Sequence, residues 1–149
     1  MPTEPLRPAD DVTRHVGYLL KRAQAALRGA MDKVLREYGL TVPQYATLEL
    51  LAQHPGMSNA DLARATFVTR QSGNVVLRGL QEAGLITRPA TADHGRALPA
   101  RLTEEGRTRL AEVQAAVYAV EQRMIEAIPP QRVAALLTDL DRIAAALEG

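Results

Sequence analysis

The sequence predicts a mainly α-helical fold that carries one small β-hairpin. Apolar residues recur at helical spacing in long stripes near both ends of the 149-residue chain. Between these stripes, residues 58–103 contain two short capped helical segments, followed by two strand-like runs around a small basic loop. That order is typical of a winged helix-turn-helix, here flanked by long helices from both chain ends.

The first part of the chain predicts a flexible segment and then two helices. Residues 1–11 are rich in proline and acidic side chains. An apolar stripe over residues 16–38 predicts a long helix that ends at Gly39. A second helix begins at Pro43, because proline fits the first helical turn, and ends near residues 54–56.

Two capped helices follow, joined by a tight turn. Ser58 and Asp61 resemble a capping box, in which the hydroxyl and the carboxylate each bind a free backbone N–H group. Thr69 can cap the second helix, whose apolar positions between residues 73 and 80 share one buried face. Gly84 suits the left-handed position just past its end. This second helix has the size and place of a recognition helix, the element that enters a DNA major groove.

The opposite face of the second helix carries side chains suited to reading bases. Guanidinium groups match the acceptors of guanine, amides match adenine, and a branched apolar side chain can contact the methyl group of thymine. The alternative interpretation is a polar face that only contacts solvent. With the caps, the strand and the loop included, the expected DNA contacts are Ser58, Asn59, Thr69, Arg70, Gln71, Ser72, Asn74, Val75, Arg78, Arg88, His94 and Arg96.

The hairpin and the charge distribution support the same interpretation. Two runs, residues 85–88 and 98–102, can pair around a short loop. Arg96 at the tip of that loop is suited to a narrow minor groove, where negative potential is concentrated. Residues 58–103 carry six arginines against three acidic residues, whereas residues 104–149 carry five basic and eight acidic residues. A positive middle segment agrees with DNA binding.

The terminal helices predict a dimer. Residues 104–128 form another apolar stripe, which Pro129 and Pro130 interrupt, and a last helix continues to Leu147. We expect these stripes to pack against a second copy of the chain around a two-fold axis. The alternative is a monomeric helical bundle. In a dimer, two recognition helices would reach major grooves about 34 Å apart, so the target would be a pseudo-palindromic operator in double-stranded DNA.

Composition argues against several other classes of protein. The chain has no cysteine, which excludes disulfides, thiol redox sensing and thiolate metal sites. We expect neither a membrane span nor a secretion signal, and therefore a cytoplasmic protein. The histidines at positions 15, 54 and 94 lie far apart, and no serine occupies a nucleophile elbow. We expect no enzymatic activity, no cofactor and no metal.

Two motifs have a distinctive form. The recognition helix ends in LQEAGLITR at residues 80–88, and the next helix begins with LTEEG at residues 102–106. Together with the long flanking helices, they resemble the MarR (multiple antibiotic resistance regulator) family over roughly residues 12–147. The resemblance implies one domain at 12–149, with a DNA-binding lobe at about 42–103 and dimerisation helices at 12–38 and 104–147.

The resemblance also implies a function. Such proteins are homodimeric regulators of transcription, usually repressors, that leave DNA when a small aromatic or phenolic ligand binds. Their ligand pocket lies where the dimerisation helices meet the DNA-binding lobe, and by position the residues most able to line it here are His15, Tyr18, Tyr38 and Tyr45. The alternative function is a helical dimer that acts mainly through a protein partner and binds DNA weakly and without sequence preference.

The chain departs from the family pattern at two places. Two residues separate Asp93 from Arg96, where the family commonly has one, so we expect a longer loop. Gly79 stands where the family often has arginine, which leaves Arg78 to supply a phosphate or base contact. Gly79 also lowers helix propensity by about 1 kcal/mol.

Overall fold

The computed structural model describes residue 7 and residues 11–88 and 100–149. This part of the chain is mainly helical with one two-stranded hairpin, which confirms the predicted fold class. The elements, with η for 3-10 helices, are η1 (Val12–Arg14), α1 (Val16–Arg36), α2 (Val42–Gln53), α3 (Asn59–Ala65), α4 (Arg70–Glu82), β1 (Ile86–Thr87), β2 (Arg101–Leu102), α5 (Glu104–Glu126), η2 (Pro130–Arg132) and α6 (Val133–Glu148).

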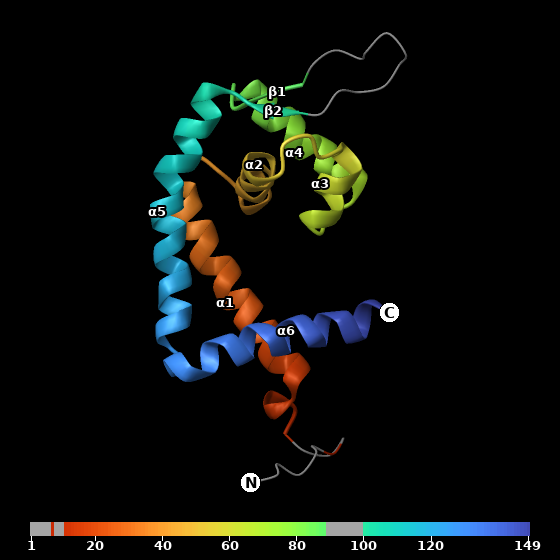
Figure 1. Cartoon of the computed structure of the whole chain (residues 1–149), viewed down its shortest axis with the longest axis vertical. Helices are drawn as coiled ribbons and strands as arrows, with labels where there is room; N and C mark the ends of the chain where they lie inside the picture. The colour runs from red at the N-terminus through yellow and green to blue at the C-terminus, as the bar shows by residue number, and fades with distance from the viewer. Residues whose placement is uncertain (1–6, 8–10, 89–99) are drawn as a thin grey trace.

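The helices form a lobe at one end of a long helical stalk (Figure 1). The stalk consists of α1 and α5, which run side by side and contact each other. The lobe consists of α2, α3, α4 and the hairpin. α6 begins near the end of α5 that lies far from the lobe, and it turns away from α5. Because α2 contacts α1, α4, α5 and β2, it joins the lobe to the stalk.

The hydrophobic core lies where the lobe meets the stalk. Its most deeply buried side chains come from four helices and the residue before β1, and are Leu35, Leu48, Leu77, Leu80, Leu85 and Val113. Full burial of one such side chain stabilises the fold by about 1.5–3 kcal/mol. The lobe and the adjoining part of α5 therefore pack around one core.

Side-chain caps begin the helices of the lobe. The hydroxyls of Ser58 and Thr69 accept the backbone N–H groups three residues ahead, at 3.0 Å and 3.1 Å, which confirms the predicted hydroxyl cap at each residue. The Asp61 carboxylate, predicted to complete a capping box, pairs with Arg64. Thr41 adds a cap that the sequence analysis did not identify. Its hydroxyl accepts the N–H of Gln44 at 3.3 Å, and the Gln44 side chain accepts the N–H of Thr41 at 3.0 Å.

Two elements are shorter than the sequence predicts. α1 ends at Arg36, because the N–H of Tyr38 bonds back to the carbonyl of Leu35 at 2.9 Å and Gly39 then adopts a φ of 71°. Among the described residues, the hairpin consists of the antiparallel pairing of β1 with β2. The predicted loop between the two strands lies outside the described residues.

A tight joint connects the end of α4 to the start of α5. Gly84 has a φ of 77°, and the N–H of Leu85 donates to the carbonyl of Leu80 at 3.0 Å. The Thr103 hydroxyl donates to the carbonyl of Gly84 at 2.7 Å and accepts the N–H of Gly106 at 3.0 Å. A Cβ on Gly106 would lie 2.0 Å from the carbonyl oxygen of Leu85. The two sequence motifs therefore meet in space and fix α4 relative to α5.

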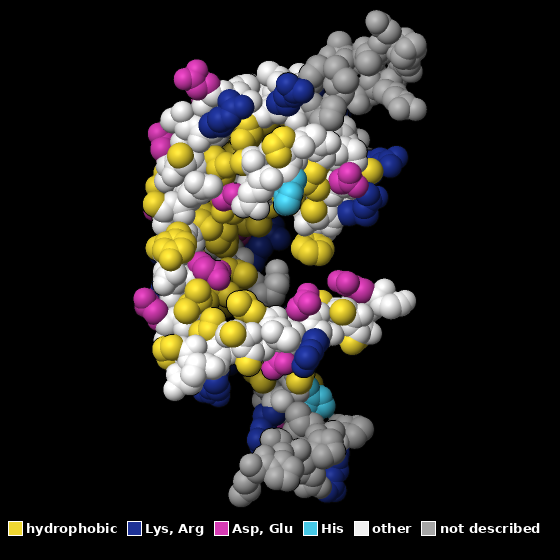
Figure 2. Space-filling model, in the orientation of Figure 1, with side chains coloured by type: hydrophobic (Ala, Val, Ile, Leu, Met, Phe, Trp, Pro, Cys, Tyr) yellow, Lys and Arg dark blue, Asp and Glu magenta, His cyan; other side chains and the backbone are white. Residues whose placement is uncertain are grey.

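The stalk leaves large apolar side chains exposed. Among the described residues, α6 buries none of its side chains, and α1 buries only Leu35. Figure 2 shows hydrophobic side chains gathered along the stalk and α6, beside the hollow that separates α6 from the lobe. None of the helices described is both long and apolar enough to cross a membrane. The exposed apolar residues of α1, α5 and α6 include Val16, Leu19, Leu27, Met124, Leu136, Leu137 and Leu140.

Candidate nucleic-acid interface

α4 presents a mixed polar and apolar face away from the core. Leu77 and Leu80 are 2% and 0% exposed on the inner side of this helix, whereas Val75 on the outer side is 59% exposed. Guanidinium, amide and branched apolar groups are the combination that reads base edges. The residues predicted to contact DNA from α4 are exposed, or half-buried in the case of Asn74: Arg70, Gln71, Ser72, Asn74, Val75 and Arg78.

The arginines of this face keep their donors free. Arg70 and Arg78 form no ion pair or side-chain hydrogen bond with any other described residue. An unpaired exposed guanidinium has five N–H donors for phosphate oxygens or for guanine. Both side chains can therefore bind DNA without first breaking a contact with another described residue.

The hydroxyls at the start of α4 already have partners. Thr69 Oγ1 accepts the backbone N–H of Ser72 and donates to Ser72 Oγ at 3.0 Å. This pair fixes the first turn of α4 and the direction in which it points. The remaining free N–H groups of that turn are suited to a phosphate oxygen. Thr69 and Ser72, both predicted DNA contacts, therefore also form the cap of α4.

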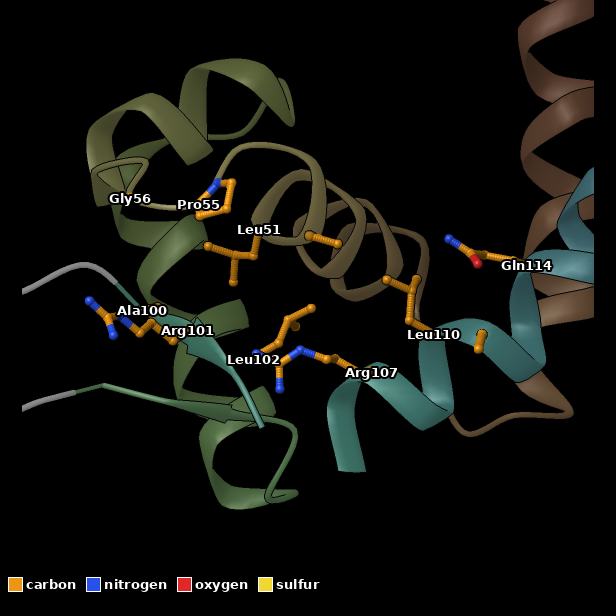
Figure 3. A pocket seen from close by; sticks show the side chains of 11 residues that line it. Leu51, Pro55, Gly56, Ala100, Arg101, Leu102, Arg107, Leu110 and Gln114 are labelled. Atoms are coloured by element: carbon orange, nitrogen blue, oxygen red, sulfur yellow. The ribbon is translucent and has the colours of Figure 1, made fainter. Parts of the chain in front are cut away.

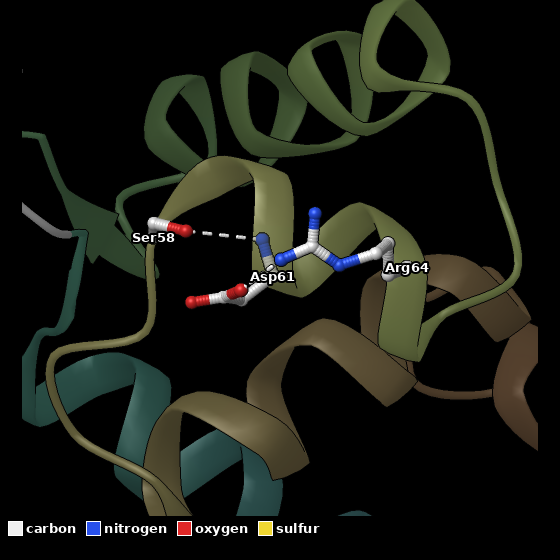
Figure 4. A network of polar contacts seen from close by, with 3 residues as sticks. All are labelled: Ser58, Asp61 and Arg64. Atoms are coloured by element: carbon white, nitrogen blue, oxygen red, sulfur yellow. Dashed lines mark hydrogen bonds and ion pairs between the residues drawn. The ribbon is translucent and has the colours of Figure 1, made fainter.

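A polar network lies at the start of α3 (Figure 4). The Ser58 hydroxyl accepts the N–H of Asp61, and the Asp61 carboxylate pairs with the guanidinium of Arg64 one turn ahead. Hydrogen bonding with Ser58 and the adjacent guanidinium hold the pKa of Asp61 below its usual value. Arg64 is a partner that the sequence analysis did not assign. Asn59, the first residue of α3, is half-buried.

The hairpin carries a further exposed basic residue that was not among the expected DNA contacts. Arg88, a predicted contact, follows β1 and is half-buried, and the predicted contacts His94 and Arg96 lie outside the described residues. Arg101 on β2 is exposed beside the buried Ala100. The alternation of buried and exposed positions along a strand could have identified Arg101 from the sequence.

A cavity of about 580 Å³ lies between the stalk and the helix-turn-helix. Three helices, α1, α2 and α5, form most of its wall, and the turn between α3 and α4 forms the rest. The lining is largely apolar and includes a guanidinium, a carboxylate and an aromatic phenol. These residues are Gln24, Leu27, Arg28, Met31, Val42, Pro43, Tyr45, Ala46, Thr66, Phe67, Val68, Val117, Val120 and Glu121.

Tyr45 is the predicted ligand residue that lines this cavity. Its hydroxyl donates to Glu49 Oε1 at 2.9 Å, and Gln114 Nε2 of α5 donates to the same oxygen at 3.1 Å. Burial and the hydrogen bond to Glu49 raise the pKa of Tyr45 above its ordinary value. The phenol is therefore neutral at physiological pH, and its ring is held by contacts between α2 and α5.

The other predicted ligand residues lie elsewhere, and none of them lines this cavity. Tyr38 packs against the hydrophobic core because α1 ends before it, and its carbonyl accepts a guanidinium N–H of Arg109 at 3.0 Å. Tyr18 lies on α1 and is 44% exposed. His15 precedes α1, and its Nε2 is buried without a hydrogen-bond partner among the described residues. The sequence analysis chose these three residues by their position along the chain, and position alone did not locate the cavity.

A second cavity of about 680 Å³ lies on the outer side of the lobe, between α2, β2 and the start of α5 (Figure 3). Leu51, Leu102 and Leu110 line it, with Gln114 at the end opposite Gly56. It contains none of the residues predicted to bind a ligand or DNA. The cavity beside Tyr45 is the stronger candidate for a ligand site, because it borders both the stalk and the helix-turn-helix.

The sequence is similar to a known family and to curated repressors. Residues 38–97 match the model of the MarR family. The HTH-type transcriptional repressor Rv2887 of Mycobacterium tuberculosis is 44% identical over 126 residues, which cover 83% of this chain and 89% of that protein.

Solved structures agree with the sequence comparison. The crystal structure of Rv2887 with salicylic acid has a TM-score of 0.71 at 39% identity, and the match covers 91% of this chain and 98% of that chain. The transcriptional repressor CouR of Rhodococcus jostii, bound to a 23-mer DNA duplex, has a TM-score of 0.81 at 28% identity, with 95% of this chain and 99% of that chain covered. This chain, with its recognition helix, hairpin and long flanking helices, belongs to the MarR family.

Proposed function

We propose that this protein is a homodimeric transcriptional repressor, which binds an inverted repeat in double-stranded DNA and is released by a small aromatic ligand. The observation that carries the proposal is the outer face of α4, where arginines that pair with no other described residue flank an amide and an exposed valine. The same fold in CouR binds a DNA duplex. A regulator of this kind needs no catalytic residue or cofactor, and it acts in the cytoplasm, where the chromosome lies.

The stalk supports the dimer. Apolar side chains of α1, α5 and α6 remain exposed in the single chain, and large exposed apolar patches mark interaction surfaces. Packing two copies about a two-fold axis would cover these faces and place the two α4 helices for successive major grooves, about 34 Å apart. Sedimentation should give a mass twice that of the chain at micromolar concentration.

The cavity beside Tyr45 supports release by a ligand. It is largely apolar, carries the Arg28 guanidinium, and lies between the stalk and the lobe. Rv2887 has been crystallised with salicylic acid, an aromatic carboxylate. A ligand that binds the free form better than the DNA-bound form weakens operator binding by the ratio of those two affinities.

The test is duplex binding by fluorescence anisotropy, with the intergenic DNA beside the gene and a random duplex of equal length. A specific repressor prefers the intergenic duplex by 10³-fold or more, an order-of-magnitude expectation that should hold as salt is raised. Arg70→Ala and Asn74→Ala should change base preference at defined positions of the operator. Arg123→Ala is the matched control, because it removes a charge from the last turn of α5, remote from the lobe.

Two outcomes would contradict the proposal. Equal binding to both duplexes would favour the alternative, a helical dimer that acts through a protein partner. A uniform loss of affinity in Arg70→Ala and Asn74→Ala across all sequences would reduce these residues to phosphate contacts.

A further inference from the structure

Phe67 combines two unfavourable features at the turn between α3 and α4. Its φ is 59°, and no other non-glycine residue in the described ranges has a positive φ. A left-handed backbone costs a residue with a bulky side chain about 1–3 kcal/mol. Its side chain is also 93% exposed. Glycine or asparagine would adopt this backbone more cheaply, so the folded chain gains nothing evident from a phenyl ring here.

The ring lies at the boundary of the cavity beside Tyr45. Phe67, Thr66 and Val68 are the part of its lining that belongs to the helix-turn-helix turn, whereas the rest comes from α1, α2 and α5. A ligand in this cavity therefore meets the stalk on one side and Phe67 on the other.

The turn is tied closely to both helices that it joins. The N–H of Phe67 donates to the backbone carbonyl of Arg64 at 3.2 Å, and the N–H of Val68 donates to the backbone carbonyl of Ala63 at 3.0 Å. Thr69, two residues after Phe67, caps α4. Further along, a Cβ on Gly73 would lie 3.3 Å from the Cβ of Ala63, so α3 and α4 pack with little space between them. A displacement at Phe67 consequently moves α3 and α4 as one unit.

We propose that Phe67 is the residue through which an aromatic carboxylate in this cavity acts on the recognition helix. The ring of the ligand stacks on Phe67, and its carboxylate pairs with Arg28, whose side chain is 55% exposed and otherwise contacts Asp32 at 3.7 Å. The contact draws the turn toward α1, and because α4 is fixed to α5, the lobe moves with α5 as one body. This inference rests on the proposed function, since it assigns a residue to the ligand response.

The composition of the chain offers a direct probe. Phe67 is the only phenylalanine in the sequence, so growth with 4-fluorophenylalanine gives a protein with a single fluorine resonance. Salicylate should shift that resonance in a saturable manner, and a duplex that carries the operator should move it to a different position. A resonance that does not move while calorimetry detects bound salicylate would overturn the proposal, and so would the absence of salicylate binding.

Substitutions provide the second test. Phe67→Asn keeps a residue that tolerates the left-handed backbone and removes the ring. It should weaken salicylate binding about 3- to 10-fold, the range of one aromatic pair, and change duplex affinity without ligand by less than about twofold. Phe67→Tyr should restore salicylate binding. Arg123→Ala, in the last turn of α5 and outside this cavity, is the control and should change neither affinity.

The possible failures are distinguishable. Salicylate binding of undiminished strength in Phe67→Asn would overturn the role of Phe67. Loss of the dimer in Phe67→Asn, measured by sedimentation, would assign the ring to the subunit interface and would also overturn it. If the unsubstituted protein preferred no duplex, the proposed function would fail, whereas a saturable fluorine shift with salicylate would still support the contact between ligand and Phe67.

Discussion

Replacing Gly106 with alanine is expected to destabilise the protein, because the new Cβ would lie 2.0 Å from the carbonyl oxygen of Leu85. Carbon and oxygen atoms in close contact are about 3.3 Å apart, so α5 or Leu85 would have to move by about 1.3 Å. That carbonyl also accepts the N–H of Thr103 at 3.0 Å, and Thr103 caps α5. The movement would therefore disturb a hydrogen bond and a cap as well as the packing.

The magnitude follows from these contacts. Overpacking costs about 1–3 kcal/mol, and a lost hydrogen bond costs about 1 kcal/mol. The higher helix propensity of alanine offsets this loss of stability by about 1 kcal/mol. The net loss is about 1–3 kcal/mol, which lowers the melting temperature of a domain of this size by about 2–12 °C. Urea unfolding followed by circular dichroism at one fixed protein concentration measures it, since the stability of a dimer depends on concentration.

Gly79→Ala is the matched control for this measurement. A Cβ on Gly79 would lie 3.4 Å from Gln44 Nε2, an ordinary contact with the end of a side chain. Alanine there should leave stability unchanged or raise it by up to about 1 kcal/mol. If Gly106→Ala were as stable as the unsubstituted protein, or if both variants changed stability equally, the joint between α4 and α5 would not have the rigidity inferred here.

Three further measurements test other parts of the structure. Because the pKa of Tyr45 is raised in the folded state, its contribution to stability is present at neutral pH and is lost as pH rises above its ordinary value of about 10. Tyr45→Phe should remove this alkaline loss of stability and a late step in the ultraviolet titration of phenolate. Arg78→Ala should reduce the slope of log affinity against log salt by about 1 if the side chain binds a phosphate, and an unchanged slope and affinity would remove it from the interface. A spin label on Gln81→Cys, possible because the chain has no other cysteine, should give one distance between the two α4 helices of a dimer, and salicylate should change it; an identical distance with and without salicylate would contradict release by movement of α4.

The elements that the sequence predicted correctly are determined by local interactions. Ser58 and Thr69 cap helices with groups three residues away, and Gly84 ends α4 through its own backbone conformation. The motif at the joint of α4 and α5 is recognisable in the sequence. The need for glycine at position 106 is visible only in the structure, because the contact between Gly106 and Leu85 forms when α5 packs against the lobe.

The candidate ligand site was harder to predict, because it depends on where helices cross. Tyr38 and Tyr45 both lie on apolar stripes, yet only Tyr45 lines the cavity. Phe67 had no signal beyond its apolar character, since a positive φ at a non-glycine residue follows from the geometry of the whole turn. A periodic pattern specifies the buried face of a helix and leaves unspecified which neighbour will cover it.

In the proposed dimer, the geometry of the stalk would let a small ligand control DNA binding. α5 contains 23 residues, and at 1.5 Å per residue it is about 34 Å long. A tilt of about 5° at its far end therefore moves the lobe by about 3 Å. Hydrogen bonds to bases tolerate a change in donor–acceptor distance of only a few tenths of an ångström. Because the joint at Gly84 and Gly106 fixes α4 to α5, such a tilt reaches the recognition helix undiminished, and two helices matched to one operator spacing would no longer fit it together.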